Sequence, residues 1–273
     1  MFEIPQNQLI DIVSRAGAAI LEVYQGEIEV TNKSDASPLT QADLAAHEII
    51  VRGLAEATPD VPIVSEESEA PSFDVRRQWR SYWLVDPLDG TKEFINRNGE
   101  FTVNIALIEE GQAVYGIVGV PVQDRIFIGD VKQDGAWCYQ QGELKPIHSR
   151  RMTSDVRDVV VVASRSHGGE RLENYLDDLA THFDGLVRQP VGSSLKLCTL
   201  AAGDADCYPR LGPTSEWDIA AAHAVLRAAG GEVYTFDREV LPYNSKESLL
   251  NPEFVAVADA EFDWWGVLPP QPE

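Results

Sequence analysis

The sequence predicts a mixed protein, with an α+β first half and an α/β second half. In the first half, two stretches of helical periodicity precede several short apolar segments with turn residues between them. Beyond a change of character near residues 149–154, strand-like and helix-like segments alternate along the chain. We therefore expect two subdomains, residues 1–150 and 151–273, that meet at a cleft.

The first half should place two helices on an antiparallel sheet. Apolar residues recur at helical spacing over residues 7–25, and Gly26 is a suitable stop. After a polar loop at 31–38, Thr40 and Asp43 form the start of a second helix, with Thr40 as its cap. Both residues are therefore left out of the functional site. Strands are predicted at residues 61–64, 82–85, 102–108, 113–120 and 125–128.

The second half should form an α/β layer. Helices are predicted from about residue 170, over 194–202, and over 216–229, where Gly230 ends the helix. Strands are predicted at residues 159–163, 187–190, 205–208, 232–235 and 254–257. The tryptophans of the tail, residues 264–270, are expected to pack on the body of the protein.

Composition and charge limit the classes of partner. The 273 residues carry a formal net charge of −22, which argues against a nucleic-acid-coating surface. A small anionic ligand would need local cations, either metal ions or a few Lys and Arg residues. The three cysteines lack paired metal-ligand spacing and fit reduced thiols in a cytoplasmic protein.

The sequence also bears on membrane association and assembly. Its first residues do not combine a basic segment with an apolar run, so we expect no secretory signal. No stretch has the apolar length needed to span a bilayer. Peripheral association with the inner membrane stays open, as does the choice between monomer and homodimer.

The most informative segment places two aspartates at the end of an apolar strand. Asp86 ends the strand, Pro87 prevents its continuation, and Gly90 permits a tight turn that brings Asp89 near Asp86. Carboxylates this close repel each other unless they are protonated or bridged by cations. Hard oxygen ligands suit Mg²⁺. The alternative is a turn whose aspartates cap the backbone.

Other acidic residues stand in equivalent places. Glu66 and Glu67 follow the strand at 61–64, and Asp218 lies in the first turn of the helix at 216–229. A Glu pair after a strand also fits a solvated loop, and an acidic residue in a first turn stabilises the helix dipole. Their joint occurrence favours a metal site.

These segments resemble the inositol monophosphatase superfamily, and its 3'(2'),5'-bisphosphate nucleotidase branch in particular. The resemblance covers nearly the whole chain up to about Val257. Its motifs, in chain order, are Lys-Ser-Asp-Ala-Ser-Pro-Leu-Thr (33–40), Glu-Glu (66–67), Asp-Pro-Leu-Asp-Gly-Thr-Lys-Glu-Phe-Ile (86–95), Gly-Ser-Ser-Leu-Lys (192–196), Tyr-Pro-Arg (208–210) and Glu-Trp-Asp-Ile-Ala-Ala (216–221).

The resemblance implies a layered αβαβα sandwich and a magnesium-dependent phosphatase site. It implies two or three Mg²⁺ ions, held by Glu66, Asp86, Asp89, Asp218 and the main-chain carbonyl of Leu88. Asp35 and Thr91 would orient and deprotonate the attacking water. The alternative for Asp35 is an Asx turn. The alternative for Thr91 is a hydroxyl that only hydrogen-bonds nearby backbone groups.

The same resemblance implies the substrate and its contacts. The expected reaction is hydrolysis of adenosine 3',5'-bisphosphate to AMP and phosphate, a recycling step in sulfur metabolism that lithium inhibits. The alternative to substrate binding is a solvated loop for His167 and ordinary surface charge for Lys196 and Arg210. The implied substrate contacts are Glu66, Asp89, Gly90, Thr91, His167, Ser193, Lys196, Arg210 and Asp218.

Several other functions stay open. An inositol monophosphatase or a sugar bisphosphatase would use the same metals, since specificity depends on the pocket. A covalent aspartyl-phosphate phosphatase usually has one residue between its two aspartates, whereas here there are two. The alternating oxygen residues of a calcium loop are absent. A non-catalytic metal-binding protein is the alternative outside the enzymes.

Overall fold

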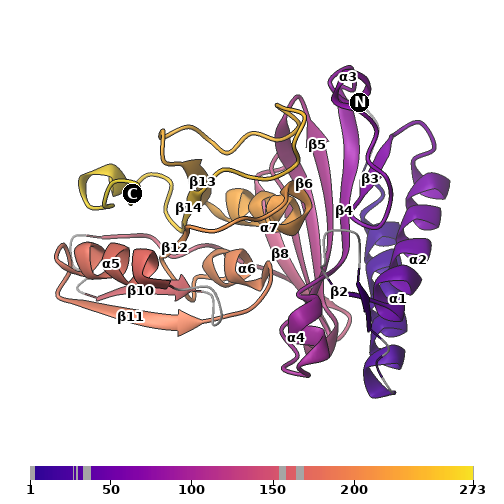
Figure 1. The fold of residues 1–273 in the computed structure, drawn as a ribbon, viewed down its shortest axis with the longest axis horizontal. Helices are drawn as coiled ribbons and strands as arrows, with labels where there is room; N and C mark the ends of the chain where they lie inside the picture. Colours follow the sequence, from indigo (N-terminus) through magenta and orange to yellow (C-terminus); the bar gives the residue numbers. More distant parts are fainter. Residues whose placement is uncertain are drawn as a thin grey trace.

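The fold consists of five layers that alternate between helices and sheets (Figure 1). The computed structural model describes residues 4–26, 28, 30–32, 38–153, 158–163 and 169–272. A seven-stranded and a five-stranded sheet enclose a central helical layer, and further helices cover their outer faces. This arrangement confirms the predicted αβαβα sandwich.

The first helical layer consists of α1 (Gln6–Gln25) and α2 (Gln41–Ala57), which confirms both predicted helices. The apolar faces of both helices pack on the seven-stranded sheet. Thr40 caps α2 as predicted, since its hydroxyl accepts from the Ala42 amide at 3.2 Å. Two short paired strands, β1 (Val30–Asn32) and β2 (Pro38–Thr40), lie between the helices, where the sequence predicts a loop.

The seven-stranded sheet follows chain order, and its pairs are antiparallel apart from the parallel pair β3–β4. The five predicted strands are confirmed, whereas β8 and β9 were not predicted. All of β9 is exposed, so it has no apolar pattern to detect. The strands are β3 (Ile63–Ser65), β4 (Ser81–Asp89), β5 (Thr102–Glu109), β6 (Gln112–Val120), β7 (Arg125–Asp130), β8 (Gly135–Gln140) and β9 (Glu143–Pro146). Short helical turns between them are α3 (Phe73–Arg76), α4 (Thr91–Ile95) and η1 (Pro121–Gln123).

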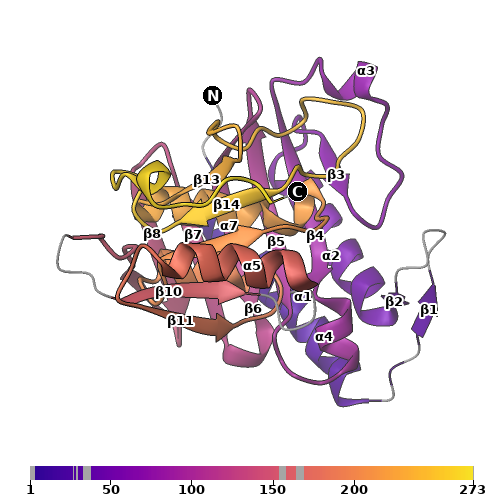
Figure 2. The ribbon, with the colours of Figure 1, turned by 60° about the vertical axis from the view of Figure 1, so that its left-hand side comes forward.

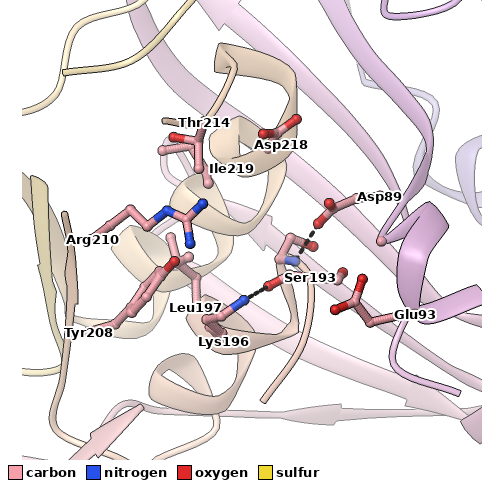
Figure 3. Close-up of a pocket in the computed structure, with 12 residues that line it drawn as sticks. Asp89, Glu93, Ser193, Lys196, Leu197, Tyr208, Arg210, Thr214, Asp218 and Ile219 are labelled. Atoms are coloured by element: carbon pink, nitrogen blue, oxygen red, sulfur yellow. Dashed lines mark hydrogen bonds between the residues drawn. The ribbon is translucent and has the colours of Figure 1, made fainter. Parts of the chain in front are cut away.

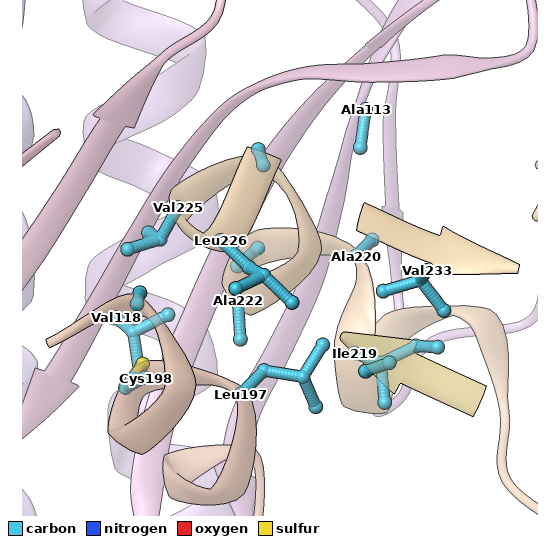
Figure 4. Packing of buried hydrophobic residues seen from close by; sticks show 14 of the residues in the cluster. Ala113, Val118, Leu197, Cys198, Ile219, Ala220, Ala222, Val225, Leu226 and Val233 are labelled. Atoms are coloured by element: carbon cyan, nitrogen blue, oxygen red, sulfur yellow. The ribbon is translucent and has the colours of Figure 1, made fainter. Parts of the chain in front are cut away.

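The central layer consists of α6 (Leu195–Ala201) and α7 (Glu216–Ala229), which confirms two further predicted helices. Helix α7 lies very close to β6 and β7. A Cβ atom on Gly116 would lie 2.0 Å from the Ala221 carbonyl oxygen, and one on Gly129 would lie 2.5 Å from the Val225 Cα. Only glycine permits this approach, and small α7 side chains such as Ala220 and Ala222 fill the space between the sheets (Figure 4).

The five-stranded sheet has the order β11-β10-β12-β14-β13. Strand β10 is parallel to β11 and β12, and the other pairs are antiparallel. All five predicted strands are confirmed, as is α5 (Gly169–Ala180), which covers the outer face (Figure 2). The strands are β10 (Asp158–Ala163), β11 (Gly185–Pro190), β12 (Cys207–Arg210), β13 (Glu232–Thr235) and β14 (Phe254–Val257).

The C-terminal tail packs on the body, as the sequence predicts. Trp264, in the turn η2 (Trp264–Gly266), is buried, and its Nε1 donates to the Asp259 carbonyl at 2.9 Å. Trp265 contacts the Tyr234 ring edge-on, with ring centroids 5.7 Å apart. The tail therefore completes the apolar cluster beneath α5.

The sheets change near the predicted division at residue 150. The seven-stranded sheet ends at Pro146 and the five-stranded sheet begins at Asp158, yet α7 packs on the first sheet. The two subdomains therefore stay a prediction.

Cys138, Cys198 and Cys207 are buried free thiols, as expected. Among the described residues, no helix has the length and apolar character needed to cross a membrane.

Candidate active site

The register of β3 against β4 brings Glu66 beside Asp86. The two strands run parallel with Ser65 opposite Val85, so Glu66, which directly follows β3, lies level with Asp86 of β4. The Glu66 amide donates to the Val85 carbonyl at 3.0 Å, which fixes this position. The carboxylates that end both predicted strands are thus neighbours.

A bulge in β4 adds Asp89 to this group. Asp86 lies opposite Asn104 of β5, and Asp89 lies opposite Thr102. An advance of three residues along β4 therefore matches two residues of β5, so β4 contains one extra residue. The Asp86 carboxylate accepts from the Leu88 amide at 3.0 Å inside the bulge. Gly90 follows with a φ of +88°, and a Cβ there would lie 3.2 Å from the Ser193 Cβ. Glycine therefore lets the Asp89 turn approach the loop that carries Ser193.

Asp218 reaches the same place from the central helical layer. It lies in the first turn of α7, where its Oδ2 accepts from the Ser215 amide at 2.9 Å. One carboxylate oxygen each from Glu66, Asp86 and Asp218 lies within 4.8 Å of the other two. The consecutive strands β3 and β4 and the distant helix α7 thus bring their acidic residues together at one point.

The electrostatics of these carboxylates fit a divalent cation. Burial, and then the charges of Glu66, Asp89 and Asp218, hold the pKa of Asp86 well above its usual range. Burial and the Asp89 charge do the same to the pKa of Asp218. Without a cation, like charges this close together are stable only when protonated. A hard ion such as Mg²⁺ would let all of them ionise and would take their oxygens as ligands.

Asp89 differs from its neighbours because a positive charge and a hydrogen-bond donor lie near its carboxylate. Its Oδ2 accepts from the Ser194 amide at 2.5 Å. Burial raises its pKa, whereas the Lys196 charge and hydrogen bonds from Ser193 and Ser194 lower it, which leaves a pKa of about 6. Asp89 therefore lies between the acidic cluster and the cationic side of the cleft.

Thr91 has a carboxylate partner, Asp43, that was not predicted for the site. The Thr91 hydroxyl lies 3.4 Å from the Asp43 Oδ1 and 3.5 Å from the Leu88 carbonyl. The other Asp43 oxygen accepts from the Thr40 amide at 2.8 Å and hydroxyl at 2.6 Å. Asp43 therefore caps α2 with one oxygen and faces Thr91 with the other.

The opposite wall of the cleft is cationic (Figure 3). Lys196 lies in the first turn of α6 and is buried. Its Nζ donates to the Ser193 carbonyl at 2.9 Å and lies 5.5 Å from the centre of the Tyr208 ring. Arg210 ends β12 and donates to the Gly212 and Pro213 carbonyls at 3.2 and 2.9 Å. Burial lowers the pKa of Lys196 to about 8 despite the Asp89 charge.

Two adjoining hollows form the cleft. One, with about 530 Å³ of empty space including its mouth, is lined by Asp89, Ser193, Lys196, Tyr208, Arg210 and Asp218 among others. The second adds Glu66 and Thr91 and shares Asp89, Gly90, Glu93, Thr214 and Asp218 with the first. The cleft therefore joins an acidic cluster to a cationic wall.

The structure brings together most of the predicted site residues. The two hollows are lined by Glu66, Asp89, Gly90, Thr91, Ser193, Lys196, Arg210 and Asp218, with Asp86 beside them. The Leu88 side chain is buried, and its carbonyl faces Thr91. Asp35 and His167 lie outside the described residues. Asp43, Glu93, Tyr208 and Thr214 were not predicted for the site. The Thr-x-x-Asp spacing at the start of α2 signals a cap and gives no sign that Asp43 also faces Thr91.

Comparisons with known proteins agree with this geometry. The model of the inositol monophosphatase family matches residues 6–262. The 3'(2'),5'-bisphosphate nucleotidase CysQ of Escherichia coli (strain K12) is 47% identical over 250 residues, which cover 91% of this chain and 97% of that protein. Its namesake in Haemophilus influenzae is 35% identical over 260 residues, 94% of each chain.

A solved structure gives the same result. The crystal structure of CysQ from Bacteroides thetaiotaomicron, described as a bacterial member of the inositol monophosphatase family, superposes with a TM-score of 0.80. It is 40% identical to this chain, and the match covers 94% of this chain and 98% of the other. The fold, the acidic cluster and these similarities lead to one conclusion: the chain belongs to the inositol monophosphatase family.

Proposed function

We propose that the protein removes the 3'-phosphate of adenosine 3',5'-bisphosphate to give AMP and phosphate, with Mg²⁺ as cofactor. The observation that carries this proposal is the position of Lys196 and Arg210 across the cleft from the carboxylate cluster. A substrate with two phosphates can place one at the carboxylates, with bound cations between, and the other against these two side chains. The relatives named 3'(2'),5'-bisphosphate nucleotidase support the same substrate class.

Each group of residues has a defined task in this reaction. Glu66, Asp86, Asp89, Asp218 and the Leu88 carbonyl would hold two or three Mg²⁺ ions, which when bound neutralise phosphoryl charge and acidify water. Lys196 and Arg210 would bind the phosphate that is not cleaved, and the Tyr208 ring keeps Lys196 in place. The buried thiols of Cys138, Cys198 and Cys207 support a cytoplasmic location.

We propose Asp43, with Thr91, as the pair that accepts the proton of the attacking water. Thr91 alone is a weak base, but its hydroxyl can pass a proton to the Asp43 oxygen that faces it. The other Asp43 oxygen is held by the Thr40 cap, so the carboxylate is fixed in orientation. Asp35 stays the prediction drawn from the resemblance.

Replacing Asp43 by Asn tests this pair without removing the helix cap. The oxygen of the new side-chain amide can still accept from Thr40, while the amide nitrogen would donate toward Thr91 and could not accept a proton. We expect kcat to fall about 10²- to 10⁴-fold, the usual contribution of general base catalysis. Steady-state kinetics with saturating Mg²⁺ measure the effect.

Glu56→Gln is the matched control, because it removes an exposed carboxylate from the same helix. It should leave kcat at the wild-type value. Both variants should keep the wild-type melting temperature, since neither removes the α2 cap. A D43N enzyme with wild-type kcat would exclude Asp43 from the proton path.

The identity of the product tests which phosphate is removed. We expect ³¹P NMR of the reaction to show 5'-AMP, with lithium inhibiting at millimolar concentration because it competes for a magnesium position. Formation of 3'-AMP would mean that the two phosphates bind in the opposite arrangement. Indifference to lithium would contradict the proposed branch of the family.

A further inference from the structure

Three hydroxyl groups and an amide connect β5 to the active-site loop. The Thr102 hydroxyl lies 2.6 Å from the Ser193 hydroxyl and 2.8 Å from the Ser194 hydroxyl. The Ser194 hydroxyl lies 2.8 Å from the side-chain amide of Asn104. At the other end, the Ser194 amide donates to the Asp89 Oδ2 at 2.5 Å. The side chains Asn104–Ser194–Thr102–Ser193 therefore form an unbroken chain that ends at the loop holding Asp89.

The Asn104 amide fixes the direction of this chain. Each hydroxyl has one proton, so if the amide donates to Ser194 through its Nδ2, the Ser194 proton must go to Thr102 and the Thr102 proton to Ser193. The Ser193 proton is then left for the cleft that Ser193 and Asp89 both line.

The surroundings of Asn104 support this direction. With its oxygen toward Ser194, the buried Asn104 Nδ2 has no hydrogen-bond partner among the described residues. A half-turn of the amide exchanges nitrogen and oxygen at nearly constant shape. It gives the nitrogen an acceptor and leaves an unpaired carbonyl oxygen, which is tolerated better than an unpaired N–H.

We propose that Asn104, Ser194, Thr102 and Ser193 form a one-way chain of hydrogen-bond donors, and that Thr102, which holds both serines of the loop whose Ser194 amide binds Asp89, is a positioning residue for this metal ligand. Ser193 has a φ of +52°, a conformation that non-glycine residues rarely adopt, so the loop needs such contacts to stay in place. The chain also joins the seven-stranded sheet to a loop of the second half at the cleft. The proposal rests on the proposed metal-dependent phosphatase function.

Thr102→Val and Thr102→Ser form a matched pair that tests Thr102. Valine keeps the shape but removes the hydroxyl, whereas serine keeps the hydroxyl and removes the methyl. We expect T102V to weaken Mg²⁺ binding about tenfold, as loss of a partner that orients a ligand typically does. T102S should bind Mg²⁺ like the wild type. Calorimetric titration with Mg²⁺ in the absence of substrate measures both.

A merely structural role for Thr102 gives a different pattern. Both variants would then lower the melting temperature while their Mg²⁺ affinity stayed at the wild-type value, and that result would overturn the proposal. The titration needs no substrate, so its outcome does not depend on which phosphate ester the wild type prefers. Failure of the proposed substrate would appear only in turnover by the wild type.

Neutron diffraction from crystals of the wild-type protein with Mg²⁺ tests the direction itself, even if T102V does not fold. We expect the Thr102 deuterium to point at Ser193 and a deuterium of the Asn104 amide to point at Ser194. A Thr102 deuterium directed at Ser194 would contradict the one-way chain.

Discussion

Asp89→Asn should lower kcat/KM for the phosphate ester about a thousandfold. The amide oxygen of the variant side chain can still accept the hydrogen bond from the Ser194 amide. However, the variant loses the negative charge with which Asp89 would hold a cation between the substrate and the acidic cluster. Metal ions supply several kcal/mol of charge stabilisation to such transition states, and about 4 kcal/mol corresponds to a thousandfold change in rate. Initial rates of phosphate release at increasing Mg²⁺ concentration measure the loss.

The fold of the D89N variant should survive. In the absence of Mg²⁺, the substitution removes one of several closely spaced carboxylates that repel one another, so the melting temperature should equal or exceed that of the wild type. Added Mg²⁺ should stabilise the variant less than the wild type. Asp124→Asn, in an exposed turn, is the matched control and should retain full activity. Wild-type turnover by D89N would remove Asp89 from the metal site.

Lys196→Met should lower kcat/KM for substrates with two phosphates much more than for substrates with one. The cationic wall would contact only the phosphate that is not cleaved, so we expect kcat/KM for adenosine 3',5'-bisphosphate to fall roughly 100-fold, or about 3 kcal/mol. For an ester with a single phosphate, kcat/KM should change little. The ratio of the two values, measured in parallel, isolates the role of Lys196 in specificity.

Lys145→Met is the matched control for the loss of one positive charge. Lys145 is exposed on β9 and pairs with Glu143. Its removal should leave both kcat/KM values unchanged, which separates a local contact from general electrostatic steering by the acidic protein. An equal loss with both substrates in K196M would show that Lys196 acts on the cleaved phosphate or on the structure of the loop.

The layers of the fold could be predicted because their sequence patterns are local. The helical periodicity of α1, the Gly230 stop of α7 and the continuous apolar runs of the buried strands are each visible within a short window. Strand β9 could not be found in this way, since all its residues are exposed and its pairing with β8 depends on the rest of the sheet.

The acidic residues of the site were visible for a similar reason. Glu66 directly follows a strand, Asp86 lies near the end of one and Asp218 is in the first turn of a helix, so each side chain is placed by one element. Asp43 was missed because its two oxygens have different partners, and only the cap partner Thr40 is near in sequence. The contacts of Thr102 with Ser193 and Ser194 join residues about ninety positions apart, and no local pattern reveals them.

Phosphate release from adenosine 3',5'-bisphosphate and from inositol 1-phosphate, each with Mg²⁺ and with a chelator, tests the central claim most directly. We expect rapid release from the nucleotide with Mg²⁺, much slower release from the inositol ester, and none from either ester with the chelator. Preference for the inositol ester would keep the metal site but contradict the proposed roles of Lys196 and Arg210. Release that persists with the chelator would contradict the metal-dependent mechanism itself.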